Sequence, residues 1–155
     1  MNRLYVLMTL SILVFSQCKS FKKSDSDLEM ETISTGLKKA SFQAPKKWMV
    51  ILPGLGCNGC IQEGEAFMRD FIDSTGIFFI LTKVQSVKIL QQKIGKHINN
   101  RVNVFIDNDG VFSLPTKNVI YPCIVQLDNG KIVKHQFQSP ANGQAFEWLK
   151  IQMEQ

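Results

Sequence analysis

Two cysteines, Cys57 and Cys60, are separated by Asn58 and Gly59, and this spacing constrains the fold more than any other feature of the chain. Two intervening residues let the sulfurs either close a small disulfide or share a metal ion. The apolar run 48–52 precedes the pair, and a segment of helical periodicity follows it. We therefore expect a buried strand that delivers a dithiol to the edge of a sheet, at the start of a helix.

The helix predicted after the dithiol begins close to Cys57. Its apolar face is expected to consist of Ile61, Phe67, Met68, Phe71 and Ile72. The free N–H groups and partial positive charge at a helix start favour the thiolate form of a cysteine. This position is therefore expected to stabilise a thiolate on Cys57.

The first residues of the chain predict export. Arg3 is followed by the apolar stretch 4–15, which is too short to span a membrane because a transmembrane helix needs about 20 apolar residues. Residues 1–18 resemble a bacterial lipoprotein signal, which implies that Cys18 receives lipid and becomes the mature N-terminus. The alternative is an ordinary secretory signal that leaves Cys18 as a free thiol. Either signal delivers the domain to the periplasmic side of a bacterial membrane, where disulfides persist.

The segment 19–47 is rich in Lys, Ser, Asp and Glu, and we expect it to be a polar tether between the anchor and a single domain, residues 48–155. Ile33, Leu37 and Phe42 are the residues of this segment that would suit a short first strand. The chain has 18 basic and 13 acidic residues, and the lysines of the tether would attract anionic lipid headgroups. No basic face interleaved with aromatic residues is visible, so we expect no nucleic-acid partner.

Apolar runs and helical periods alternate after the dithiol. The predicted strands cover residues 48–52, 77–81, 102–106, 122–127 and 131–137. Helices are expected after Cys57, after Ser86 and around Trp148. Alternation of strands and helices implies a parallel core, whereas Asn129-Gly130 between the last two runs is a strong hairpin signal and adds an antiparallel edge.

With a dithiol at the first crossover and Pro122 at the start of a later strand, residues 48–155 resemble the thioredoxin fold, an α/β fold with a central mixed sheet flanked by helices. Residues 102–110, the pair Tyr121-Pro122 and residues 127–131 resemble the membrane-anchored branch related to TlpA and the redoxins. The resemblance implies a monomeric thiol-disulfide oxidoreductase with no cofactor beyond its dithiol. It would reduce protein disulfides and be recharged by an upstream thiol electron donor; oxidation or isomerisation is the second choice of direction.

The resemblance also implies roles for individual residues. Cys57 would be the exposed nucleophile and Cys60 the more buried resolving thiol. Pro122 would be cis and lie against the dithiol, and the backbone of Tyr121 would be presented to the substrate. The chain departs from the family at Ile51, where thioredoxins keep a buried Asp, so no base for Cys60 is visible.

Four further side chains leave alternatives open. Glu63 or Glu65, in the turn after the dithiol, would be the substitute base for Cys60. Cys123 is expected in the core, although a third thiol near the site is the alternative. His135 together with the dithiol would suit a copper or zinc protein, which is the main alternative function, although we predict no metal site. A static disulfide between Cys57 and Cys60 is disfavoured because so short a loop contributes little stability on closure.

Overall fold

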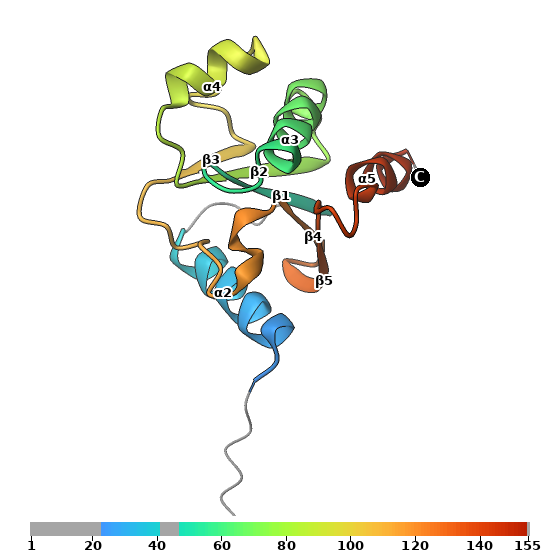
Figure 1. Cartoon of the computed structure of the whole chain (residues 1–155). Helices are drawn as coiled ribbons and strands as arrows, with labels where there is room; N and C mark the ends of the chain where they lie inside the picture. Colours follow the sequence, from blue (N-terminus) through green and yellow to red (C-terminus); the bar gives the residue numbers. More distant parts are fainter. Residues whose placement is uncertain (1–22, 41–46, 155) are drawn as a thin grey trace, which may run out of the picture.

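The structure of the protein is a computed structural model that describes residues 23–40 and 47–154 (Figure 1). Its strands are β1 (Trp48–Pro53), β2 (Ile77–Thr82), β3 (Val104–Asp107), β4 (Cys123–Asp128) and β5 (Lys131–Phe137). Its helices are α2 (Asp25–Lys39), α3 (Asn58–Phe71), α4 (Val87–Ile94), α5 (Ala145–Met153) and the short 3-10 helix η2 (Lys117–Ile120). Within the described residues, no helix has the length and apolar character needed to cross a lipid bilayer.

The strands form one five-stranded sheet in the order β3-β2-β1-β4-β5. β1, β2 and β3 are parallel, whereas β4 is antiparallel to both β1 and β5. Asn129 and Gly130 join the last two strands with φ angles of 49° and 76°, the positive values that a type I′ hairpin turn requires. The predicted α/β architecture, a mixed sheet flanked by helices, is therefore confirmed.

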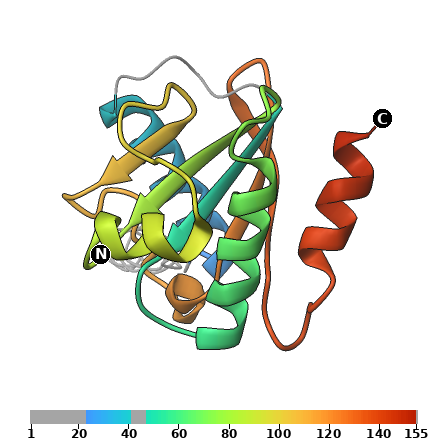
Figure 2. The ribbon, with the colours of Figure 1, turned by 90° about the horizontal axis from the view of Figure 1, so that it is seen from above.

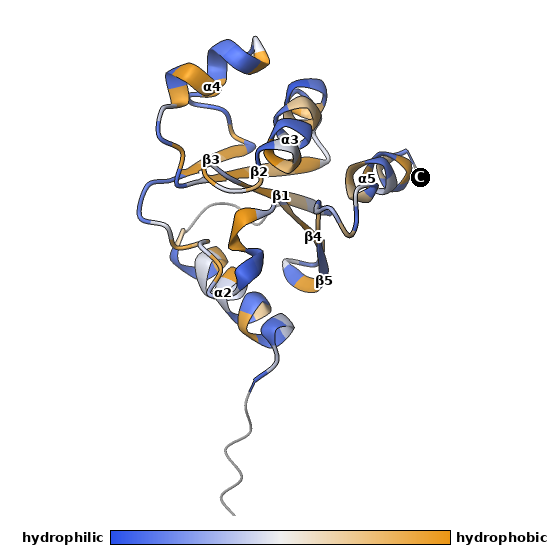
Figure 3. Cartoon of the chain, viewed as in Figure 1, coloured by the Kyte–Doolittle hydropathy of each residue, from blue (hydrophilic) through white to orange (hydrophobic). Residues whose placement is uncertain are grey.

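Each face of the sheet carries its own apolar core because successive side chains of a strand point to opposite faces. Trp48, Val50 and Leu52 of β1 pack with α3, α4 and α5, whereas Met49 and Ile51 pack on the side of α2. Figures 1 and 2 show α3 and α5 over one face and α2 under the other. In Figure 3 the apolar residues concentrate in the central strands, which are therefore covered on both sides.

Helix α2 corrects the prediction of a polar tether, which is wrong for residues 25–39. Ser24 begins the helix by accepting a hydrogen bond from the N–H of Asp27, and Ile33 is completely buried. Gly36 packs closely against Phe112: a Cβ added to this glycine would stand 2.7 Å from the aromatic ring. The expected strand at Ile33 is wrong for the same reason, while residues 1–22, with Cys18, and residues 41–46 lie outside the described residues.

Candidate active site

The dithiol lies where the sequence predicts it, between the end of β1 and the start of α3. Cys57 is the residue that precedes the first helical turn, and its carbonyl group accepts the N–H of Ile61 at 2.9 Å. The two cysteines form a disulfide in which Cys57 is half-buried and Cys60 is 6% exposed. Cys57 is therefore the more accessible cysteine of the pair, while Cys60 lies one turn deeper in the helix.

Two glycines let the loop before Cys57 pass very close to neighbouring backbone. A Cβ on Gly54 would stand 2.3 Å from the carbonyl oxygen of Lys83, at the end of β2. Gly56 has a φ of 150°, and a Cβ there would stand 2.3 Å from the carbonyl oxygen of Ile120. That oxygen accepts the backbone N–H of Cys57 at 3.0 Å. The segment before β4 therefore fixes the position of Cys57, and only glycine fits the approach at position 56.

Pro122 lies beside the helix that carries the dithiol. A Cβ added to Gly64, one turn beyond Cys60, would stand 3.3 Å from Cγ of Pro122. The expected cis bond is wrong, since every described peptide bond is trans. Tyr121 has φ −110° and ψ 144°, the extended backbone favoured before a proline, and the trans form is the usual one. Pro122 is buried and Tyr121 is half-buried, and their contact with substrate stays a prediction.

The two acidic residues considered as bases for Cys60 both bind other side chains. Glu63 accepts a hydrogen bond from the side-chain amide of Gln138. Glu65 forms an ion pair with Lys93 at 3.0 Å. Neither Glu63 nor Glu65 therefore has a contact that supports a role at Cys60. Ile51 packs on the opposite face of the sheet from α3, next to Cys123 in the strand register.

Cys123 is a core residue, as predicted. It is 1% exposed and lies in β4 on the sheet face that α2 covers. Burial raises the pKa of its thiol, and the negative charge of Glu29 raises it further. The thiol therefore stays protonated near neutral pH and is a poor nucleophile.

Sequence reasoning missed a buried carboxylate, Glu29 of α2, whose side chain is 3% exposed. Its oxygens accept hydrogen bonds from the hydroxyl of Thr116, from Nδ2 of Asn118 at 2.8 Å and from Nε2 of His135 at 2.7 Å. Burial opposes ionisation, but these hydrogen bonds outweigh it and lower the pKa of Glu29. The sequence signal that could have indicated burial of Glu29 is its position four residues before Ile33, which places both side chains on the same face of a helix.

The metal-binding alternative lacks a set of donors in the part of the chain that the structure describes. No three His, Cys, Asp or Glu side chains of residues 23–40 and 47–154 lie close enough together to hold a metal ion. Nε2 of His135 is already bound to Glu29, on the α2 side of the sheet. His135 and the dithiol therefore do not form a common site.

Comparisons with protein-family models, with curated proteins and with solved structures find no match. Sequence or structural similarity therefore assigns no family to the chain. The geometry of the dithiol and of the residues that hold it is therefore the basis for assigning a function.

Proposed function

We propose that the protein is a thiol-disulfide oxidoreductase with a thioredoxin-like fold, which reduces disulfides in protein substrates through Cys57 and Cys60. One observation carries the proposal: a half-buried Cys57 at the start of α3 is disulfide-bonded to a Cys60 that is 6% exposed. This arrangement gives an accessible first nucleophile and a protected second one, which a redox cycle requires.

In the reduced protein, the N–H groups at the start of α3 favour the thiolate form of Cys57. The Cys57 thiolate attacks one sulfur of a substrate disulfide and forms a mixed disulfide. The other substrate sulfur leaves as a thiolate and takes a proton from water. The cycle then needs a second thiolate within reach of the same sulfur atom.

Cys60 supplies that thiolate after losing its proton to water. It attacks Sγ of Cys57, the mixed disulfide breaks, and the second substrate sulfur leaves as a thiolate that takes a proton from water. Two electrons have then moved from the protein to the substrate, and Cys57 and Cys60 are left in the disulfide state described above. An upstream thiol donor would return the pair to the dithiol.

We also propose that the protein is exported and carries lipid on Cys18. The pattern of residues 1–18, which ends at Cys18, supports a lipid anchor on the periplasmic side of a bacterial membrane. Binding or delivery of copper or zinc is the less supported alternative, because the structure gives the dithiol no third donor among the described residues.

Trapping of the mixed disulfide tests the catalytic proposal. Cys60→Ser should accumulate a mixed disulfide between Cys57 and a substrate, because attack remains possible while resolution does not. Cys57→Ser should trap nothing, and Cys123→Ala is the matched control that should cycle as the wild type does. A Cys57→Ser protein that reduces a disulfide substrate at the wild-type rate would refute the proposal.

The direction of electron flow is tested by the equilibrium potential of the Cys57–Cys60 pair, measured against glutathione. A value near about −270 mV, as in thioredoxin, supports a reductant. A value near about −120 mV would instead make the protein an oxidant and overturn the proposed direction.

A further inference from the structure

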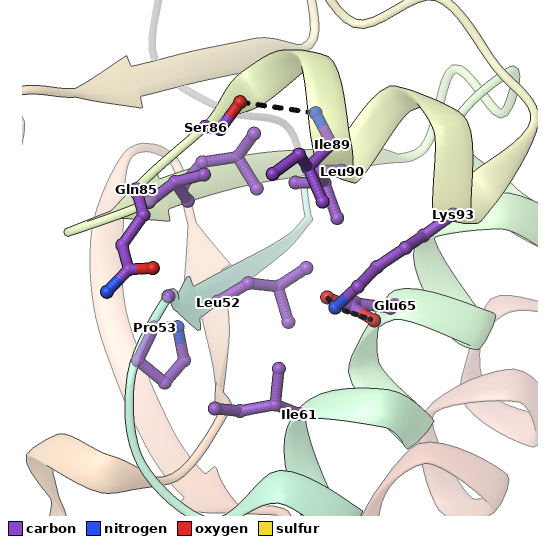
Figure 4. Close-up of a pocket in the computed structure, with 12 residues that line it drawn as sticks. Leu52, Pro53, Ile61, Glu65, Gln85, Ser86, Ile89, Leu90 and Lys93 are labelled. Atoms are coloured by element: carbon purple, nitrogen blue, oxygen red, sulfur yellow. Dashed lines mark hydrogen bonds and ion pairs between the residues drawn. The ribbon is translucent and has the colours of Figure 1, made fainter.

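A pocket of about 120 Å³ opens between α3 and α4, at the carboxyl ends of β1 and β2. Figure 4 shows Leu52 of β1 and Ile61 of α3 directed into it, and Leu90 of α4 above them. Ile89, also on α4, borders the pocket and is 56% exposed. The pocket therefore has an aliphatic wall, and Ile89 lies at its rim together with the polar residues Gln85 and Ser86.

The pocket is lined by residues that lie shortly before and after Cys57 in the chain. Gly54 and Ile61, which line it, stand three residues before and four residues after Cys57 in the chain. Four helical residues advance by about 6 Å. Since β1 lies between β2 and β4 in the sheet, the pocket is on the opposite side of the Cys57 loop from Pro122.

The charges at the pocket cancel each other. Glu65 and Lys93 are the charged residues of its lining, and they form an ion pair at 3.0 Å that Figure 4 shows at one side. A charged ligand group would have to compete with this pair for its partner. The pocket therefore favours an uncharged occupant.

The volume limits the size of that occupant. An apolar cavity of about 150 Å³ holds one benzene molecule, so a pocket somewhat smaller suits a single aliphatic side chain such as Leu, Ile or Met. Two more large apolar side chains are exposed next to the dithiol, Leu55 at 56% and Ile120 at 39%. The surroundings of Cys57 are thus suited to an apolar polypeptide.

We propose that this pocket is a specificity subsite for one uncharged aliphatic side chain of the substrate, located two residues from the cysteine that Cys57 attacks. The position follows from strand geometry. An extended substrate advances about 3.3 Å per residue, and side chains two residues apart point the same way. The side chain two positions away therefore lies about 6.6 Å along the substrate strand, comparable with the rise of about 6 Å along α3 from Cys57 to Ile61 in the pocket wall. The subsite depends on the proposed reductase function and gives it a substrate preference.

The test uses disulfide-linked dimers of a short glycine- and serine-rich peptide with one cysteine. Leu, Ala, Asp or Lys is placed two residues before or after that cysteine. The rate constant for reduction by the dithiol form of the protein is measured in single turnovers. Hydroxyethyl disulfide, which has no side chain for the pocket, is the reference substrate. In one of the two positions, Leu should exceed Ala by about tenfold, because burial of aliphatic surface is favourable, and should exceed Asp by more.

Ile89→Glu should remove the preference for Leu and leave the rate with hydroxyethyl disulfide unchanged. Ile151→Glu is the matched control, because Ile151 is also on a helix and is 57% exposed, compared with 56% for Ile89. Lys93→Met leaves Glu65 without its ion-pair partner. The rate constant for reduction of the Lys peptide should therefore rise, while that of the Leu peptide should not change.

Equal rates for Leu and Ala peptides in both positions, or equal effects of the two Glu substitutions, would refute the subsite and leave the reductase function intact. A wild-type protein that fails to reduce hydroxyethyl disulfide as well as all the peptides would refute both. These two results are distinguishable because the reference substrate reports on the dithiol alone.

Discussion

Replacement of Glu29 by Ala should destabilise the protein by about 3 kcal/mol. Removal of one partner from a buried pair typically costs about 3 to 5 kcal/mol, since the remaining polar groups lose their partners. His135 would lose its hydrogen-bond partner without compensation from water, because its side chain is only 6% exposed. Thr116 and Asn118 are only half-buried, so water replaces part of what they lose, and we take the low end of the range.

Glu31→Ala is the control for this measurement. Glu31 lies on the same helix and pairs with Lys23, but the two side chains are 57% and 53% exposed. Such a surface pair contributes at most about 1 kcal/mol. Urea unfolding of both variants, with the disulfide intact, gives the two free energies of unfolding. A Glu29→Ala loss no larger than that of Glu31→Ala would refute the structural role of the buried carboxylate.

The stabilisation by Glu29 also has a defined dependence on pH. Because the folded state lowers the pKa of Glu29, the ionised carboxylate stabilises the fold above its unfolded pKa, about 4.3. That contribution is lost as the pH falls through the lower, folded-state pKa. The difference in unfolding free energy between wild type and Glu29→Gln should therefore be constant near neutral pH and should shrink below about pH 4.

Three more predictions concern the dithiol and the N-terminus. Gly56→Ala should lower stability by about 1 to 3 kcal/mol and slow disulfide reduction, since its Cβ would stand 2.3 Å from the carbonyl oxygen that accepts the Cys57 N–H. Gly59→Ala is its control, because a Cβ there meets no atom within 4 Å; unfolding curves and turnover rates of both variants decide the point. In the reduced protein near neutral pH, iodoacetamide should modify Cys57 before Cys60, and peptide mass spectrometry that finds the reverse order would contradict the assigned roles. Mass spectrometry of the mature N-terminus should find lipid on Cys18, and an unmodified start beyond residue 18 would exclude it.

The local features of the site were predictable from the sequence. A buried strand, a dithiol and a helix start occupy one continuous segment, and the Asn129-Gly130 turn has its own backbone requirement. Helix α2 was not predictable from apolar periodicity, because its buried face includes Glu29 and Gly36 beside Ile33. A charged residue and a glycine usually indicate an exposed position. Here Glu29 is buried and hydrogen-bonded, and Gly36 leaves space for the ring of Phe112.

The contacts that hold α2 and those that hold the dithiol were not visible for a different reason: they join residues far apart in the chain. His135 and Glu29 are 106 positions apart, and the Cys57 N–H bonds to a carbonyl beyond β3. The expected cis bond at Pro122 came from resemblance alone. The structure places the proline beside α3 with a trans bond, so its position next to this helix does not depend on a cis bond.

Helix α2 and the dithiol are held by the same short segment, which contains η2. On one side, Glu29 of α2 binds the side chain of Asn118 at 2.8 Å. On the other side, the carbonyl group of Ile120 accepts the Cys57 N–H at 3.0 Å. Between these two contacts, the N–H of Tyr121 donates to the carbonyl of Asn118, which closes the turn. A change that releases α2 from the sheet would therefore also weaken the support of Cys57, and α2 is a structural part of the candidate site.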